Sequence, residues 1–210
     1  YIAAGPRSDH ETRTAREARD KLRLGMVVDA RESSMSLNIG TIVPAVADFK
    51  NLSHLTLCTD DREPEDILRD GHMNHAVARA VECGLTPEQA ITCATLNAAR
   101  EVGITNLGAI APGYVADMQI VENLSIPKPV AVFSSGRLVA ENGKMVVSIS
   151  AKDFPQERKN TVLLDMPVLE DLKIPASGAE KCVRVVDYKR RDSSGTSFSI
   201  ETLPVVDGCL

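Results

Sequence analysis

The sequence lacks tryptophan, and aromatic residues of all kinds make up only 3% of its 210 residues. Surfaces that stack nucleic-acid bases are built from such rings, so a base-stacking platform is not expected. An excess of basic residues is also absent, because 24 Lys and Arg stand against 29 Asp and Glu, which gives a formal net charge of −5. Nucleic acids and anionic membranes attract basic surfaces, and neither is therefore an expected partner.

Long apolar runs and paired cysteines are missing as well. No stretch of about 18 consecutive apolar residues occurs, so no transmembrane helix is predicted. The five cysteines are far apart and show no CxxC spacing: Cys58, Cys83, Cys93, Cys182 and Cys209. This pattern is typical of reduced thiols in a cytoplasmic protein and argues against a structural zinc site. The residues that follow Tyr1 show no secretion signal and predict a chain that begins inside a domain.

Strand and helix patterns alternate over the first hundred residues. Short apolar runs predict strands at residues 26–28 and 55–59, and a shorter strand is expected within residues 6–11. Four helices are expected from apolar spacing and capping signals: residues 12–24, 37–50, 73–81 and 86–102. Thr12 is expected to cap the first of these, and Thr86 the last, where Gln89 completes a capping box. This alternation favours a parallel sheet with crossover helices. At about 31 residues per unit, the region holds about three units of an eight-unit barrel.

The pattern changes after residue 104. Residues 107–148 contain short alternating runs with turn signals at Gly136-Arg137 and Asn142-Gly143, which predict a small β module. Residues 150–175 are charged and interrupted by proline, which indicates a linker. Two further strands are expected, at residues 182–188 and 195–206. The predicted domains are residues 1–104, 105–149 and 150–210.

Polar clusters follow each of the three predicted strands: Ser8-Asp9-His10-Glu11, Arg31-Glu32-Ser33-Ser34 and Thr59-Asp60-Asp61. The carboxyl ends of barrel strands form the mouth in which active sites lie. His10 offers an imidazole nitrogen to a divalent metal, and two adjacent acids are costly to bury without a cation or hydrogen bonds. A carboxylate beside a metal-bound water also takes and returns its proton. The coincidence of three such strand ends favours an enzyme.

Each cluster also has a plainer interpretation. The acids and hydroxyls around His10 and at Asp60-Asp61 are common helix caps, and residues 31–34 are compatible with a solvated loop. His72 and His75 share a helical spacing that allows chelation, although such pairs more often lie on the surface or in packing. From the residues alone these alternatives stay open.

The combination of segments resembles the bacterial-type adenine deaminases of the amidohydrolase superfamily. The resemblance rests on SDHE, LGMVVDARESS, the long run from LTLCTDD through GHMNH to ATLNAAREVGI, and LGAIAPGYVAD. It is nearly continuous from Tyr1 to about Lys144. The region from about Cys182 to Leu210 resembles the start of that family's additional C-terminal domain. The segment GAIAPGYVAD by itself identifies only the superfamily.

The resemblance implies a metal-dependent (β/α)8 barrel of TIM type, of which this chain carries the last three strand–helix units, followed by the small β module and the start of a further domain. The implied reaction is the hydrolysis of adenine to hypoxanthine and ammonia. His10 is implied as a metal ligand, Asp60 as a ligand that also moves a proton, and Glu11 as a further catalytic residue. The implied cofactor is Mn²⁺ or Fe²⁺, binuclear in the full-length protein, and a homodimer is the implied assembly.

Arg31, Glu32 and Asp61 match motif positions near the site and are predicted to bind substrate. The family's loop usually reads R-E-G-S, whereas this chain has Ser33 at the glycine position, which predicts a strained or altered loop if a positive φ is needed there. The other implied metal ligands, including an H-x-H pair, would precede Tyr1. We therefore expect the 210-residue segment by itself to be inactive.

Three other functions stay open from the sequence. Another amidohydrolase, acting on a cyclic amide or a different nucleobase, would use similar catalysis with different substrate contacts. A catalytically dead interaction subunit would keep the fold without the chemistry. A metal-free α/β domain would use the acids of the strand ends only as helix caps.

Overall fold

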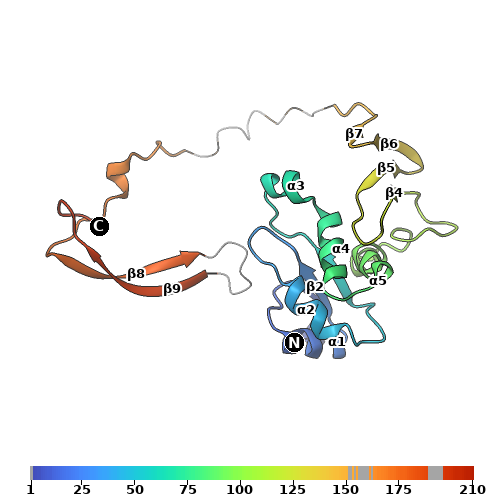
Figure 1. Ribbon diagram of the computed structural model, residues 1–210, viewed down its shortest axis with the longest axis horizontal. Helices are drawn as coiled ribbons and strands as arrows, with labels where there is room; N and C mark the ends of the chain where they lie inside the picture. Colours follow the sequence, from blue (N-terminus) through green and yellow to red (C-terminus); the bar gives the residue numbers. More distant parts are fainter. Residues whose placement is uncertain (1, 151–152, 154, 156–160, 162, 189–195) are drawn as a thin grey trace. The chain divides into compact units, whose positions relative to one another are not determined.

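The computed structural model describes residues 2–150, 153, 155, 161, 163–188 and 196–210 (Figure 1). The chain divides into two compact units, of which the first reaches to Val147 and the second begins at Ser148. Tyr1, Gly195 and part of the predicted linker at 150–175 lie outside the described residues. None of the helices in the described ranges has the length and apolar character that crossing a bilayer requires.

The first unit is built around a three-stranded parallel sheet with the order β1-β2-β3. Its strands are β1 (Ser8–Asp9), β2 (Val27–Arg31) and β3 (Leu55–Cys58). This arrangement confirms the parallel sheet that the alternating pattern predicts. Because the strands are parallel, the residues that follow their carboxyl ends leave the sheet at one shared edge.

Helices connect and cover these strands. A short 3-10 helix, η1 (Ile2–Ala4), precedes β1. The remaining helices of the unit are α1 (Ala15–Arg23), α2 (Ile39–Val46), α3 (Pro64–Asp70), α4 (Met73–Glu82), α5 (Pro87–Thr92), the π-helix η2 (Cys93–Asn97) and α6 (Ala98–Glu101). The sequence patterns miss α3, and α2 is shorter than the predicted range of 37–50.

The starts of two helices show how well local capping signals predict structure. The prediction that Thr12 caps α1 is wrong, because the cap is Thr14, whose side chain accepts the N–H of Glu17 at 3.2 Å. Thr12 is instead completely buried in the turn after β1. The predicted start of α5 is confirmed, with Thr86 as the cap and Gln89 completing a capping box.

Side chains of β2 and β3 alternate between the two faces of the sheet. The face covered by α1, α2 and α4 is apolar and buried, and it holds Val28, Ala30, Leu55 and Leu57. The opposite face is polar and holds Asp29, Thr56 and Cys58. The hydroxyl of Thr56 donates to the carboxylate of Asp29 across the two strands. The sheet therefore has one packed face and one face of polar groups.

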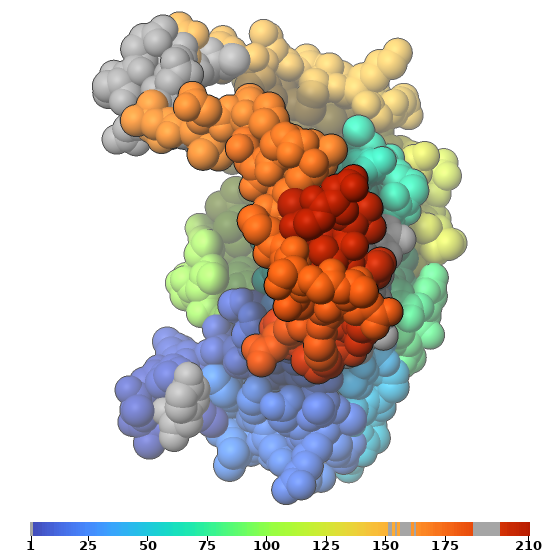
Figure 2. Space-filling model, turned by 90° about the vertical axis from the view of Figure 1, so that its left-hand side faces the viewer, coloured from blue at the N-terminus to red at the C-terminus, as the bar shows by residue number. Residues whose placement is uncertain are grey.

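The packed side is fastened by an arginine that joins α1 to the end of α2. The guanidinium of Arg19 donates to the carbonyl of Ala45 at 2.5 Å and to the carboxylate of Asp48 at 2.7 and 3.1 Å. It also lies 4.8 Å from the ring centre of Phe49. These segments form the blue and light-blue surface in Figure 2.

A four-stranded antiparallel sheet follows, with the order β4-β5-β6-β7. Its strands are β4 (Met118–Val121), β5 (Pro129–Ser134), β6 (Arg137–Glu141) and β7 (Lys144–Met145). The predicted turn at Asn142-Gly143 is confirmed, and both residues have positive φ as a type I′ turn requires. The other turn is formed by Ser135-Gly136 rather than Gly136-Arg137, because Arg137 already belongs to β6.

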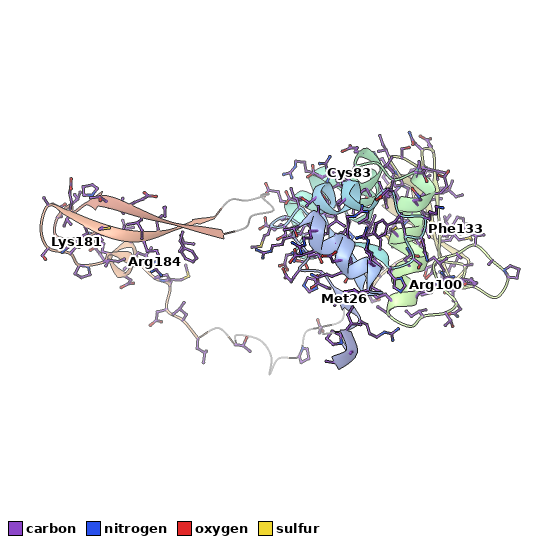
Figure 3. All side chains as sticks on the ribbon, turned by 90° about the horizontal axis from the view of Figure 1, so that it is seen from below. Met26, Cys83, Arg100, Phe133, Lys181 and Arg184 are labelled. Atoms are coloured by element: carbon purple, nitrogen blue, oxygen red, sulfur yellow. The ribbon has the colours of Figure 1, made fainter. Side chains whose placement is uncertain are left out.

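The second unit contains a short 3-10 helix, η4 (Leu169–Leu172), and an antiparallel hairpin of β8 (Glu180–Tyr188) and β9 (Thr196–Pro204). Both strands that the sequence patterns place here are present, with β9 ending two residues earlier than expected. Lys181 and Arg184 project from β8 (Figure 3).

Candidate active site

His10 and Asp60 approach each other at the edge where the parallel strands end. His10 directly follows β1, and Asp60 comes two residues after β3. The Nε2 atom of His10 lies 3.8 Å from Oδ1 of Asp60, and the two side chains are 54% and 23% exposed. Two ligand bonds of about 2.1 Å to one cation span at most about 4.2 Å. The geometry therefore fits two ligands of a single divalent metal.

The backbone of Asp60 adopts a left-handed conformation, with φ of +51°. Aspartate tolerates this region better than most residues, and strained residues of this kind cluster at functional sites. Its Oδ2 accepts the N–H of Asp61 at 2.9 Å, while Oδ1 is the oxygen that faces His10. The two carboxylate oxygens thus have different neighbours, the backbone on one side and His10 on the other.

Arg31 ties the ends of all three strands together. Its guanidinium donates to both carboxylate oxygens of Glu11, at 3.2 and 3.1 Å, and lies 3.7 Å from Oδ1 of Asp60. Oε1 of Glu11 is in turn 3.5 Å from Nε2 of His10. These four residues form what we call the strand-end cluster. The interpretation of residues 31–34 as a solvated loop is wrong, because each residue of that segment is buried.

The side chains of two predicted substrate contacts, Glu32 and Asp61, are apart from the strand-end cluster, although the backbone N–H of Asp61 donates to Asp60. Glu32 faces α4, where its Oε1 is 3.6 Å from Nε2 of His75. Asp61 is exposed, and its carbonyl accepts the N–H of Ser34 at 2.9 Å. Within the described residues, no hydrogen bond or ion pair joins either side chain to the strand-end cluster. Their role in substrate binding stays a prediction.

Ser33, His72 and His75 also differ from the simplest expectations. Ser33 does not have a positive φ, so the strain predicted from its replacement of glycine is absent. Its hydroxyl accepts the N–H of Ser36 at 2.6 Å, which closes a compact turn. His72 contacts the hydroxyl of Thr59 at 3.2 Å, whereas His75 faces Glu32, so the two imidazoles have separate partners.

Burial raises the pKa of an acid and of a thiol on the sheet. It raises the pKa of Asp29 to about 6, against the hydrogen bond from Thr56, which lowers it. Burial likewise raises the pKa of Cys58 to about 12, so its thiol stays protonated at neutral pH. A protonated thiol is a poor nucleophile, so we assign Cys58 no catalytic role.

The stability of the full-length protein is expected to depend on pH through Glu32. Burial raises the pKa of this carboxyl from 4.5 to about 7, although the charges of Arg79 and Arg62 oppose the shift. Folding therefore takes up a proton between these values, and the free energy of unfolding falls as the pH rises from about 4.5 to about 7. His75, whose pKa is lowered chiefly by burial, contributes with the opposite sign.

The variant Glu32→Gln isolates this contribution, because glutamine does not titrate and His75 is present in both proteins. Relative to the wild type, it is expected to gain on the order of 1–3 kcal/mol between pH 4.5 and pH 7.5. Chemical denaturation at both pH values measures the change. A difference between variant and wild type that is equal at the two pH values would contradict the assignment.

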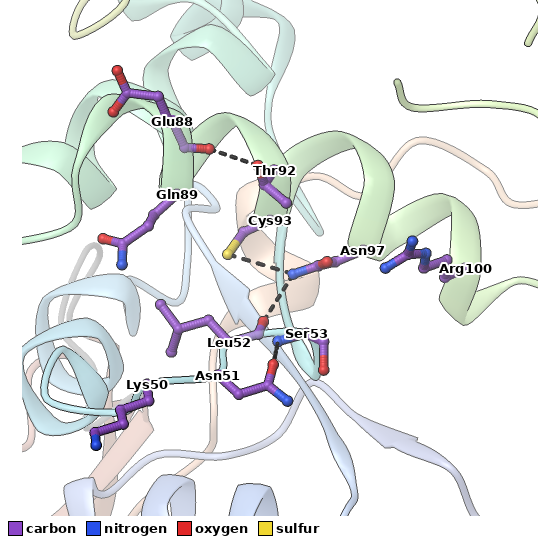
Figure 4. Close-up of a pocket in the computed structure, with 10 residues that line it drawn as sticks. All are labelled: Lys50, Asn51, Leu52, Ser53, Glu88, Gln89, Thr92, Cys93, Asn97 and Arg100. Carbon is purple, nitrogen blue, oxygen red and sulfur yellow. Dashed lines mark hydrogen bonds between the residues drawn. The ribbon is translucent and has the colours of Figure 1, made fainter. Parts of the chain in front are cut away.

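A cavity of about 340 Å³ lies away from the strand-end cluster (Figure 4). It is lined by the loop before β3 and by the α5–η2 helical segment, including Leu52, Cys93 and Asn97. Asn97 is buried and donates to the carbonyl oxygens of Leu52 at 2.8 Å and Leu55 at 2.9 Å. Because these residues precede or begin β3 and Asp60 follows it, the cavity is at the other end of the strand.

The strand-end cluster fits part of a metal site. Catalytic metal sites commonly have three protein ligands, and within the described ranges no group of three or more His, Cys, Asp or Glu has the arrangement to hold an ion. The donor types and the 3.8 Å separation of His10 and Asp60 nevertheless suit a divalent cation. These two residues are therefore candidates for membership of a larger ligand set.

The chain belongs to the amidohydrolase family, which matches residues 7–145. It is also similar to named adenine deaminases. It is 39% identical over 186 residues to the adenine deaminase of Kosmotoga olearia, covering 89% of this chain and 32% of the relative. It is 45% identical over 176 residues to adenine deaminase 2 of Carboxydothermus hydrogenoformans, covering 84% and 30%. These findings confirm the resemblance that the sequence motifs indicate.

The chain spans about a third of the length of the curated relatives it matches. Among solved structures, a beta-aspartyl dipeptidase from Fervidobacterium islandicum AW-1 is similar, with a TM-score of 0.52 and 19% identity. The likeness covers 69% of this chain and 41% of that chain. At this identity it supports a shared α/β fold and nothing about the substrate.

Proposed function

We propose that the full-length protein carrying this chain is a metal-dependent adenine deaminase, which hydrolyses adenine to hypoxanthine and ammonia in purine salvage. The observation that carries the proposal is the convergence of His10 and Asp60, 3.8 Å apart, at the strand ends of an amidohydrolase chain. Similarity to adenine deaminases at identities such as 39% and 45% supports adenine as the substrate.

The proposal includes a larger architecture. The three parallel strands and their helices are the last three units of a (β/α)8 barrel in residues 1–104, followed by the β module of residues 105–149. Residues 150–210 begin a further domain. The full-length protein is proposed to be a cytoplasmic homodimer with two Mn²⁺ or Fe²⁺ ions. The segment by itself is proposed to be inactive, because His10 and Asp60 supply only part of a ligand set.

The residues of the strand-end cluster have distinct proposed roles. When bound by His10 and Asp60, a divalent cation makes water nucleophilic at neutral pH by lowering its pKa. The carboxylate of Asp60 accepts a proton from the attacking water and returns it to the leaving ammonia. Glu11, held by two hydrogen bonds from Arg31, presents a fixed carboxylate oxygen to the amino group of adenine.

Substrate turnover by the full-length protein tests the proposal. With Mn²⁺ present, ammonia release is measured for adenine and guanine, and ring opening is measured by loss of ultraviolet absorbance for a cyclic amide such as dihydrouracil. We expect kcat/KM for adenine to exceed the other two by at least about a hundredfold, because buried polar groups discriminate strongly between hydrogen-bonding patterns. Preference for guanine or the cyclic amide would indicate a different amidohydrolase, and metal binding without turnover would indicate an inactive subunit.

A further inference from the structure

The loop that carries Asp60 is held against the loop after β2 by two backbone hydrogen bonds, both donated by the loop after β2. The N–H of Glu32 donates to the carbonyl of Cys58 at 3.0 Å, and the N–H of Ser34 donates to the carbonyl of Asp61 at 2.9 Å. These bonds continue the pairing of β2 and β3 beyond the ends of the strands. They bring the two loops into one fixed arrangement.

Arg62 adds a side-chain clamp to this arrangement. Its side chain is only 4% exposed. Its Nη1 donates to the carbonyl of Glu32 at 3.0 Å, and its Nε donates to the carbonyl of Gly71 at 2.9 Å. Nη2 lies 3.5 Å from the carboxylate of Asp70. Because the guanidinium is planar and rigid, it fixes three segments relative to one another: the loops after β2 and β3 and the junction of α3 with α4.

Ser34 anchors the same loop from its other side. Its hydroxyl accepts the N–H of Glu63 at 2.9 Å and donates to the carboxylate of Asp66, which is 1% exposed. Glu63 is the N-cap residue of α3, and its side chain makes no capping hydrogen bond. A hydroxyl from a distant loop therefore accepts the N–H of the N-cap residue, which in a capping box is bound by the side chain of the third helical residue. This contact fixes where α3 begins.

Asp60 lies between these anchors in its left-handed conformation, with φ of +51°. Such a backbone is unfavourable for a residue with a Cβ atom and persists where the surroundings hold it. We propose that Arg62 and Ser34 are positioning residues, which hold the loop so that the carboxylate of Asp60 meets His10 and binds the metal. This inference rests on the proposed function for the identity of the site. Within the described residues, neither side chain contacts the strand-end cluster, and Arg62 reaches it through its backbone N–H, which donates to the carbonyl of Asp60 at 2.9 Å.

The test compares Arg62→Lys with wild type in the full-length protein. Mn²⁺ is titrated into the metal-free proteins by calorimetry, and kcat/KM for adenine is measured at low and at excess Mn²⁺. We expect Mn²⁺ affinity to fall by about 10–100-fold, as it does when groups that orient metal ligands are removed. Excess Mn²⁺ is expected to restore most of the activity.

Arg19→Lys is the matched control, because Arg19 also donates to a carbonyl and pairs with a carboxylate, but on the packed side of the sheet. It is expected to lower thermal stability without changing Mn²⁺ affinity. Ser34→Ala provides a second variant, which is decisive if Arg62→Lys does not fold, and it is expected to lose affinity in the same direction.

The outcomes separate the two proposals. Folded Arg62→Lys and Ser34→Ala proteins that bind Mn²⁺ as tightly as wild type would overturn the positioning role. A wild type that binds Mn²⁺ without deaminating adenine would overturn the proposed function, while the affinities of the variants still test positioning. A wild type that binds no Mn²⁺ would overturn both.

Discussion

Replacing Asp60 with asparagine in the full-length protein is expected to lower kcat/KM for adenine by about a thousandfold or more. A catalytic metal contributes several kcal/mol of transition-state stabilisation, and each 1.36 kcal/mol is tenfold in rate. Asparagine keeps the shape of the side chain and tolerates the left-handed backbone of +51°, so the fold is expected to survive. Steady-state ammonia release measures the loss of activity, and metal content per protein measures the accompanying loss of bound metal.

Asp20→Asn is the control for this substitution. Asp20 lies on α1 and forms an ion pair at the surface, 3.6 Å from Arg16. The same loss of one negative charge there is expected to leave metal content and turnover unchanged. Equal metal content in Asp60→Asn and wild type would support the alternative in which Asp60 merely caps a turn.

The second large effect is expected at Gly108, in the LGAIAPGYVAD segment. Gly108 has φ of +86°, and a Cβ atom there would lie 2.7 Å from backbone atoms of Thr95 and Leu96 in η2. Gly108→Ala therefore combines an unfavourable backbone conformation with a collision that no side-chain rotation relieves. We expect a loss of about 2–5 kcal/mol in the free energy of unfolding. Chemical denaturation followed by circular dichroism measures it.

Gly143→Ala separates the two contributions. Gly143 has a similar φ of +76°, but nothing lies within 4 Å of the position of its Cβ. Only the backbone cost of about 1–2 kcal/mol is expected there. Similar losses in the two variants would show that the loop around Gly108 moves away from η2 and that close approach does not explain this glycine.

Sequence signals predict those features of the fold that depend on neighbouring residues, such as helix starts and hairpin turns. The start of α5 at Thr86 and the turn at Asn142-Gly143 depend on neighbouring residues, and the structure has both. Parallel topology brings His10 and Asp60 together once each is recognised as a strand-end residue. The approach of the two proposed metal ligands therefore follows from chain order and strand direction.

Contacts between distant segments account for what the sequence patterns miss. Residues 31–34 look like a solvated loop because Glu11, the partner of Arg31, is far away in the sequence. The N-cap side chain of α3 makes no capping hydrogen bond, and the hydroxyl that accepts the N–H of Glu63 comes from Ser34. Arg62 carries no local feature that distinguishes a buried clamp from a surface charge. Such partners become visible only when the chain is folded.

The most direct test of the account is a crystal structure of the full-length protein with Mn²⁺, using anomalous scattering to place the metal. We expect an anomalous peak within about 2.3 Å of both His10 Nε2 and Asp60 Oδ1, as metal–ligand distances require. A fully occupied metal that contacts neither of these atoms, in a protein that deaminates adenine, would contradict the assignment of these two residues.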